Sequence, residues 1–141
     1  DTQQLAYVLK AGEHEAPAYL NAALASGNAV QDHLTQAFVT GRSGNEILRI
    51  ALENGRKAGL KPWIYTHPIG YHGHAAGPTI GMWDNQGITP GSGDYPLRPN
   101  TAYSIELNNT IFVKEWNKDV RVMLEEEAFF DGQQVQYLNG R

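Results

Sequence analysis

Apolar positions in the first part of the chain predict one short strand and two helices. An apolar run over residues 5–9, closed by Gly12, predicts a strand followed by a turn. From Pro17 the apolar residues recur three and four positions apart, which predicts a helix that ends near residues 26–28. The same spacing resumes over residues 30–38, so a second helix is expected there.

A third amphipathic helix is predicted around the apolar residues 47–52. Its start carries the pattern of a capping box, with Ser43 as the cap and Glu46 three residues further along. Gly59 marks the end of the helix, and Pro62 follows soon after. The first half of the chain is therefore expected to be mainly helical.

The second half of the chain changes character. Glycine and proline are dense over residues 68–99, which predicts a long functional loop region. Alternating or short apolar runs then predict strands over residues 103–108, 111–113, 120–127 and 135–138. Because helices come first and antiparallel strands second, the predicted fold class is α+β.

The composition fits one folded domain over residues 1–141. Apolar residues make up 41% of the chain, which is enough for a packed core. The net charge is −4 and lysine and arginine form no cluster, so no nucleic-acid partner is expected. The absence of cysteine excludes thiolate zinc sites, and no apolar run is long enough to span a membrane. Trp63, Trp83 and Trp116 are expected to pack in the core or on loops.

Histidines gather in the glycine-rich segment. His67, His72 and His74 lie within eight residues, and histidine is both the commonest metal ligand and the usual acid or base near neutral pH. No acidic residue closely follows His74, which disfavours a cupin or a metallo-β-lactamase pattern. His14 and His33 lie in polar stretches and are expected at the solvent surface.

Two glutamates stand on the polar faces of predicted strands. Glu106 lies between two apolar residues, and Glu125 shares its face with Glu127. A solvated sheet face is the simplest interpretation of either glutamate alone. Together with the histidine-rich segment, however, they supply one nitrogen and two carboxylate ligands, a set that suits Mn, Fe, Co or Zn.

The order of these residues resembles the pita-bread metallopeptidases, which include methionine aminopeptidases, aminopeptidase P and the Xaa-Pro dipeptidases. Residues 67–70 (His-Pro-Ile-Gly) resemble the family's His-Gly-Ile-Gly segment, whose histidine is a metal ligand, and His74 falls at its second active-site histidine. Residues 104–106 (Ser-Ile-Glu) resemble its next ligand strand. Residues 124–126 (Leu-Glu-Glu) resemble the Ile-Glu-Asp whose glutamate bridges two metals. Asp1 and the run after it resemble the second of two aspartate ligands and its strand.

This resemblance implies a fold, a reaction and a set of roles. The implied fold is the later part of the pita-bread fold, with helices on a curved, mostly antiparallel sheet. The implied reaction is hydrolysis of Xaa-Pro peptide bonds by a dinuclear centre whose bridging hydroxide is the nucleophile. Asp1, His67, Glu106 and Glu125 would be the metal ligands, and His74 and Glu125 the catalytic residues. Two divalent ions are implied, Mn before Co, Fe or Zn. The implied partners are a peptide with proline after the scissile bond and a second copy of the chain, and the family's usual compartment is the cytoplasm.

The sequence also departs from that pattern. The chain begins at Asp1, and the family's first aspartate ligand is not present, so residues 1–141 are expected to be the C-terminal portion of a catalytic domain and inactive alone. Met123 stands where prolidase-like members often carry arginine, and Trp63 where aminopeptidase P-like members carry another histidine. Glu127 is an alternative to Glu125 as the last ligand, because both lie on one face.

Two other interpretations of the chain stay open. A non-catalytic protein- or peptide-binding module of the same fold is the first alternative. An unrelated α+β domain with scattered polar residues is the second.

Overall fold

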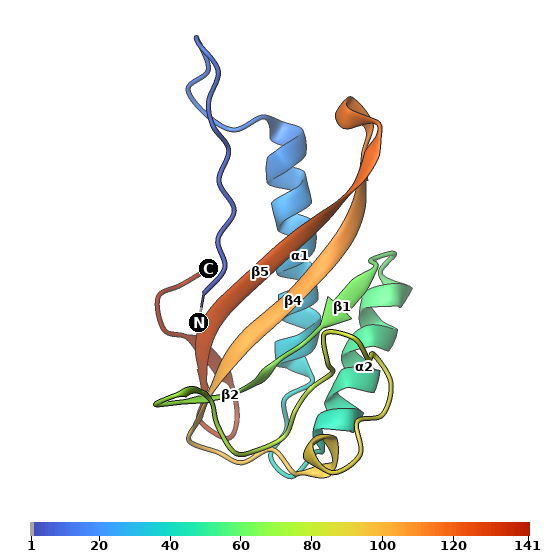
Figure 1. Ribbon diagram of the computed structural model, residues 1–141, viewed down its shortest axis with the longest axis vertical. Helices are drawn as coiled ribbons and strands as arrows, with labels where there is room; N and C mark the ends of the chain where they lie inside the picture. Colours follow the sequence, from blue (N-terminus) through green and yellow to red (C-terminus); the bar gives the residue numbers. More distant parts are fainter. Residues whose placement is uncertain (1) are drawn as a thin grey trace.

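A long antiparallel hairpin is the centre of the fold (Figure 1). The computed structural model describes residues 2–141, and within them a six-stranded sheet packs against two helices. The sheet has the strand order β3-β2-β4-β5-β6, and β1 also pairs with β4. The elements are α1 (Ala18–Gln36), α2 (Gly44–Lys57), β1 (Pro62–Ile64), β2 (His67–Gly70), β3 (Gly73–His74), β4 (Thr101–Val113), β5 (Lys118–Phe130) and β6 (Val135–Tyr137).

The hairpin joins β4 and β5 in one unbroken register. Thr101 lies opposite Phe130 at one end, and Val113 lies opposite Lys118 at the other. A short 3₁₀ turn connects the strands and ends at Asn117, whose φ of 50° places it in the left-handed region. The two strands predicted over residues 103–108 and 111–113 are therefore a single strand.

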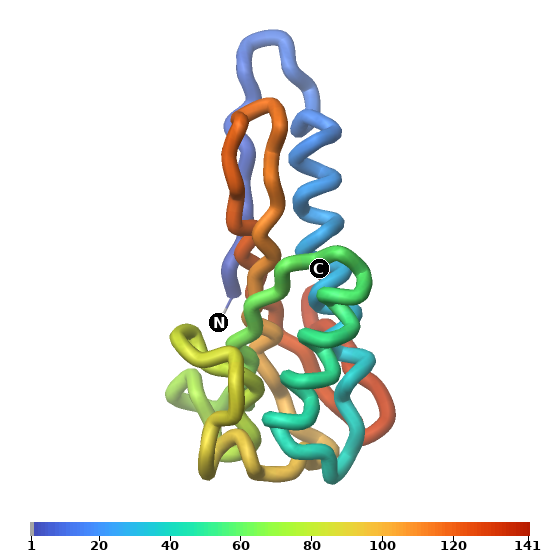
Figure 2. Tube along the Cα trace, turned by 90° about the vertical axis from the view of Figure 1, so that its right-hand side faces the viewer, coloured from blue at the N-terminus to red at the C-terminus, as the bar shows by residue number. Residues whose placement is uncertain are grey.

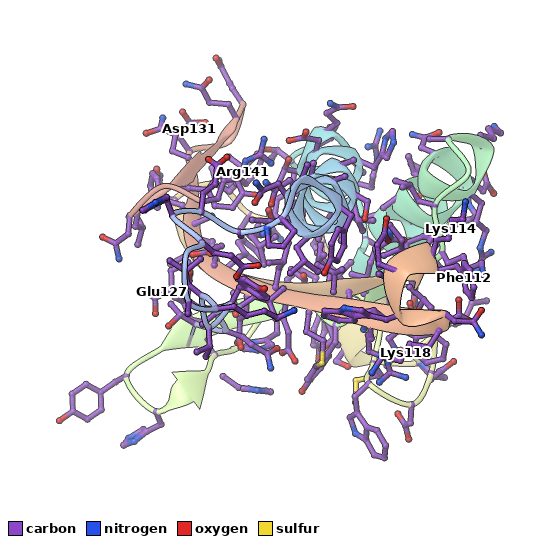
Figure 3. All side chains as sticks on the ribbon, turned by 90° about the horizontal axis from the view of Figure 1, so that it is seen from above. Phe112, Lys114, Lys118, Glu127, Asp131 and Arg141 are labelled. Atoms are coloured by element: carbon purple, nitrogen blue, oxygen red, sulfur yellow. The ribbon has the colours of Figure 1, made fainter. Side chains whose placement is uncertain are left out.

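Alternation along the hairpin separates an apolar face from a polar face. The apolar face packs against α1 and α2, which lie on one side of the hairpin, while the β2–β3 segment projects on the other side (Figure 3). Phe38 stands edge-on to Tyr103 and to Phe130 within this core, with ring centroids 5.2 and 5.7 Å apart. Large fully buried side chains in the core include Leu34, Ile47, Ile64, Ile105 and Phe130. The polar face is thereby left available for a site.

The predicted break between two helices at residues 26–28 is wrong, because α1 runs continuously through it. Gly27 is buried inside α1, and a Cβ built on it would lie 2.8 Å from Leu124 Cδ1 and 3.1 Å from Val122 Cγ1. The glycine therefore allows the helix to approach the sheet closely and does not end it. Figure 2 shows α1 running alongside the hairpin.

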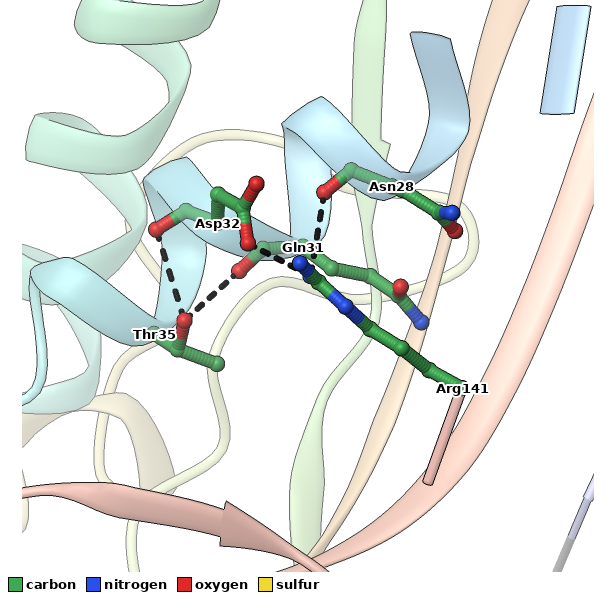
Figure 4. Close-up of polar contacts among 5 residues, drawn as sticks. All are labelled: Asn28, Gln31, Asp32, Thr35 and Arg141. Carbon is green, nitrogen blue, oxygen red and sulfur yellow. Dashed lines mark hydrogen bonds and ion pairs between the residues drawn. The ribbon is translucent and has the colours of Figure 1, made fainter. Parts of the chain in front are cut away.

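The C-terminal end of the chain is tied to α1 (Figure 4). The Arg141 guanidinium donates to the carboxylate of Asp32 and, at 3.4 Å, to the carbonyl of Asn28. The Thr35 hydroxyl donates to the Gln31 carbonyl at 2.9 Å within the same helix. The contacts of Arg141 hold the irregular segment after β6, residues 138–141, against the helix.

The predicted start of α2 is confirmed. The Ser43 hydroxyl accepts the Glu46 backbone N–H at 3.3 Å, and the Glu46 carboxylate accepts the Ser43 backbone N–H at 3.0 Å. The Ser43 hydroxyl also donates to the Glu46 carboxylate at 2.9 Å, and the backbone and hydroxyl hydrogen bonds to this carboxylate lower the pKa of Glu46. Such a cap contributes about 1 kcal/mol of stability.

Two other predicted segments differ from the structure. Residues 5–9 form no strand, and Gln3 alone makes a bridge with Glu125. The run is apolar but finds no partner strand within residues 2–141, and Leu5 and Val8 are exposed. The predicted loop region 68–99 contains some regular secondary structure, namely most of β2, all of β3 and a 3₁₀ turn.

Neither α1 nor α2 combines the length and the apolar character that crossing a bilayer needs.

Candidate metal centre

Strand pairing places the predicted ligands side by side on the polar face of the sheet. Glu106 of β4 lies directly opposite Glu125 of β5, and His67 of β2 lies opposite Ser104 of β4. Residues opposite each other in an antiparallel pair point to the same face, and so do residues two apart on one strand. His67 therefore reaches the two carboxylates diagonally across β4.

The three side chains converge to the separation of a shared ion. One ligand atom from each of His67, Glu106 and Glu125 lies within 4.8 Å of the other two. His67 Nε2 is 3.8 Å from a carboxylate oxygen of Glu106. Ligands that bind a first-row metal at about 2 Å lie up to about 4 Å apart, so small side-chain rotations would complete the coordination.

The tautomer of His67 is fixed by its own backbone neighbourhood. Nδ1 lies 3.0 Å from the Pro68 carbonyl, which can only accept, so Nδ1–H is the donor. Nε2 of the neutral ring then carries a lone pair, and it is buried without a hydrogen-bond partner among residues 2–141. Burial lowers the pKa of His67, which favours the neutral ring. A metal ion on Nε2 would satisfy this buried atom, and the Nδ1–H to carbonyl bond is the usual support of a ligating histidine.

The two carboxylates share little compensating charge. Burial, with the neighbouring Glu125 as second cause, raises the pKa of Glu106 to about 7. Glu125 is oriented by the Ser104 hydroxyl, which donates to its Oε1 at 2.8 Å. Burial first, and then the charges of these two glutamates, also raise the pKa of Tyr65. A divalent cation between the carboxylates would remove their mutual repulsion, so the residues present fit a metal.

His74 stands beside this group. It lies opposite Ile69 in the β2–β3 pair, and its ring stacks on that of His67 with centroids 3.7 Å apart. The ring of Tyr65 is 5.4 Å from His67 and 5.9 Å from His74. The exposed edge of His74 is therefore held near the carboxylates by ring packing.

Glu127, His14 and His33 do not belong to the converging group. Glu127 lies opposite Ser104, two residues along β5 from Glu125. Asp1, the predicted additional ligand, lies outside the described residues. His14 is exposed, as expected, whereas His33 is half-buried.

Some residues of the site were not singled out from the sequence. Ser104 was on the polar face by alternation, but its bond to Glu125 depends on the register of the hairpin.

None of the three tryptophans is in the core, since Trp63, Trp83 and Trp116 are 42%, 69% and 43% exposed. Sequence periodicity did not indicate this exposure.

Among known proteins, the chain resembles solved structures in fold but matches no sequence family. No protein-family model and no curated protein sequence matches the chain. Solved structures that share the fold include an X-Pro aminopeptidase from Thermotoga maritima MSB8, at 20% identity and a TM-score of 0.61 over 90% of this chain and 33% of that one. Methionine aminopeptidases from Thermotoga maritima and Rickettsia prowazekii follow, at 14% and 13% identity and TM-scores of 0.60 and 0.59, over 90% and 87% of this chain and 54% and 53% of theirs.

These structures confirm the pita-bread fold and the α+β class expected from the sequence. The chain spans between a third and about half of the length of the aminopeptidases that it matches. At this level of identity the likeness concerns the fold.

Proposed function

We propose that this chain is the later part of the catalytic domain of a metal-dependent peptidase that hydrolyses Xaa-Pro bonds. The observation that carries the proposal is the buried Nε2 of His67, which has no hydrogen-bond partner among the described residues and lies close to the opposed carboxylates of Glu106 and Glu125. Its setting on the fold of metallo-aminopeptidases supports a peptide as the substrate. Asp1 would add a further ligand.

Each residue of the site has a role that its surroundings support. Bound divalent ions, Mn before Co, Fe or Zn, would lower the pKa of a water nucleophile and polarise the scissile carbonyl. His67, Glu106 and Glu125 would hold the ions, and Glu125 would bridge them. The Glu125 carboxylate would also take the proton that the water releases, and the Ser104 hydroxyl keeps it oriented for this. His74 would donate a hydrogen bond to the negative charge that develops on the carbonyl oxygen.

Metal titration of the intact protein tests the ligand set. After removal of metal with a chelator, calorimetric titration with Mn²⁺ or Co²⁺ should give saturable binding. Glu125→Gln should weaken it by about 100-fold or more, because even a supporting residue of a metal site contributes 10- to 100-fold. Glu127→Gln is the matched control, and it should leave affinity within about threefold of wild type, less than the loss of a supporting residue produces.

The titration also separates the alternatives. If Glu127→Gln abolished binding and Glu125→Gln did not, Glu127 would be the ligand. If neither substitution changed metal affinity, the proposed centre would be wrong. Metal-loaded protein that bound an Xaa-Pro dipeptide without hydrolysing it would support the peptide-binding module instead.

A further inference from the structure

A cleft with an excess of positive charge is formed by the hairpin and by the turn that joins α2 to β1. It has a volume of about 470 Å³, and no residue of the candidate metal centre lines it. The charged residues that line it are Arg56, Lys61, Asp119 and Arg121. Three cations and one carboxylate give this lining a net charge of +2, whereas the whole chain carries −4, so the rest of the chain carries −6. The cleft is therefore a basic island on an acidic protein.

Strand pairing places two of these cations on either side of one hydroxyl group. Thr110 of β4 lies opposite Arg121 of β5, and on its other side the Thr110 backbone N–H donates to the Lys61 carbonyl at 3.3 Å. Neighbouring strands are about 5 Å apart, so the Cα atoms of Lys61 and Arg121 lie about 10 Å apart across Thr110. Both side chains are long enough to meet at a common ligand above the Thr110 hydroxyl.

The protein itself does not neutralise these cations. Arg56, Lys61 and Arg121 make no ion pair and no side-chain hydrogen bond within the range 2–141. Asp119 is the one carboxylate among the described residues that line the cleft, and it forms no ion pair with them. An anion in the cleft would reduce the mutual repulsion of the three cations.

An unpartnered amide also lines the cleft. Asn108 is 8% exposed, and its side chain makes no hydrogen bond with any described residue. The next residue, Asn109, points to the opposite face of β4 and is satisfied by the Lys61 backbone N–H and the Ser26 hydroxyl. Because buried polar side chains nearly always have a partner, the Asn108 amide is a donor reserved for a ligand in the cleft.

The arrangement of the donors favours a phosphate group. They come from α2, from the turn before β1, from β4 and from β5, and so approach a ligand from several sides. A phosphate group has three acceptor oxygens in a tetrahedral arrangement, whereas a planar carboxylate has two. The volume of the cleft is also in the range of small-molecule sites. An extended acidic peptide would leave the cleft and cross surroundings of net negative charge, which disfavours it.

We propose that this cleft binds a small phosphate-bearing molecule with at least two negative charges. Lys61 and Arg121 contact the phosphate oxygens, Thr110 and Asn108 donate hydrogen bonds to them, and Arg56 adds a further positive charge. The inference does not rest on the proposed function, because Arg121 lies four residues from Glu125, about 14 Å along β5.

Calorimetric titration of the metal-free intact protein with sodium pyrophosphate tests the site. Metal is removed on a chelating resin, because a soluble chelator is itself a polyanion. Binding should saturate at millimolar concentrations, and Lys61→Gln and Arg121→Gln should each weaken it by about fivefold, the upper end for an exposed charge pair. Lys57→Gln is the matched control, since Lys57 is exposed next to Arg56 but does not line the cleft, and at physiological ionic strength it should change affinity by less than about twofold.

Asp119→Asn gives a test that a damaged fold cannot imitate. Removing the one carboxylate of the lining should strengthen pyrophosphate binding by about two- to fivefold, because it removes a repulsive charge. Weaker binding of pyrophosphate to this variant would contradict the proposed site.

Three other results would overturn the inference. The first is the absence of saturable pyrophosphate binding, and the second is an equal loss of affinity in Lys57→Gln and Lys61→Gln, which would indicate a general attraction of anions. The third is binding of citrate or of a glutamate oligopeptide as tight as that of pyrophosphate, which would assign the cleft to carboxylates. Because metal is absent throughout, failure of the proposed metal centre would leave these outcomes unchanged.

Discussion

Replacing Glu106 by glutamine should stabilise the metal-free protein at alkaline pH while removing its metal affinity. The side chain of Glu106 is mostly buried, with 28% of its surface exposed, and it faces the carboxylate of Glu125. These surroundings raise its pKa from 4.5 to about 7. The folded protein therefore keeps a proton on Glu106 at pH values where the unfolded chain has lost it. Glutamine has nearly the same shape and carries no charge.

The sign and the magnitude follow from this difference in pKa. Because the unfolded chain binds fewer protons between pH 4.5 and about 7, the free energy of unfolding of the wild type should fall as pH rises through this range and level off above it. Each pKa unit corresponds to about 1.4 kcal/mol, so the full effect is about 3 kcal/mol. Partial exposure to solvent reduces it, and a gain of about 1–3 kcal/mol for Glu106→Gln at pH 8 is expected.

Urea unfolding in the presence of a chelator measures the effect at pH 5 and at pH 8. Glu53→Gln is the matched control, because Glu53 is an exposed carboxylate that pairs with Arg49 one helical turn away, and its loss should change stability by less than about 1 kcal/mol at either pH. Mn²⁺ should reverse the order, since a ligand at 1,000 times its Kd stabilises the wild type by about 4.1 kcal/mol and should not act on the variant. If Glu106→Gln lowered stability equally at both pH values, the charge repulsion inferred at this site would be refuted.

Three further substitutions test the reaction, the helix packing and the helix cap. Glu125→Gln in the intact, metal-loaded protein should leave less than about a tenth of the wild-type turnover of an Xaa-Pro dipeptide, because an amide neither bridges two cations nor accepts the proton of water. The circular dichroism spectrum should stay unchanged. Higher turnover would exclude the bridging and proton-accepting role of Glu125. Gly27→Ala should cost about 1–3 kcal/mol in urea unfolding, since its Cβ would lie 2.8 Å from Leu124 Cδ1, and an unchanged midpoint would show that the helix can move away. Ser43→Ala should lower the free energy of unfolding by about 1 kcal/mol and raise the pKa of Glu46 towards its usual value, which NMR titration measures. An unchanged stability and an unchanged pKa would contradict the capping box.

Local patterns predicted the elements whose signals lie within a few residues. The capping box of α2 needs only Ser43 and Glu46, and the alternation along the hairpin assigns Glu106 and Glu125 to the polar face without knowledge of any partner. The error at Gly27 has a different origin. The residue that makes glycine necessary there is Leu124, which lies far away in the sequence, so the local pattern indicates a break.

Long-range contacts also explain why β4 was predicted in two pieces. Asn109 is a poor strand former, but its side chain accepts the Lys61 backbone N–H at 2.8 Å and donates to the Ser26 hydroxyl at 2.9 Å. These partners satisfy a buried amide that the sequence pattern treats as a turn residue. Tertiary hydrogen bonding thus outweighs the intrinsic preference at this position.

The register of the hairpin decides the chemistry proposed for the metal centre. Rows of side chains on the polar face follow one another at intervals of two residues: His67 with Ser104, then Glu106 with Glu125, and then Asn108 with Met123. A slip of one residue would turn every one of these β5 side chains into the core, and a slip of two would place a different β5 residue opposite Glu106. The two carboxylates and their neighbours therefore cannot vary independently, because the same pairing that apposes Glu106 and Glu125 also places Ser104 and Asn108 in the rows on either side of them.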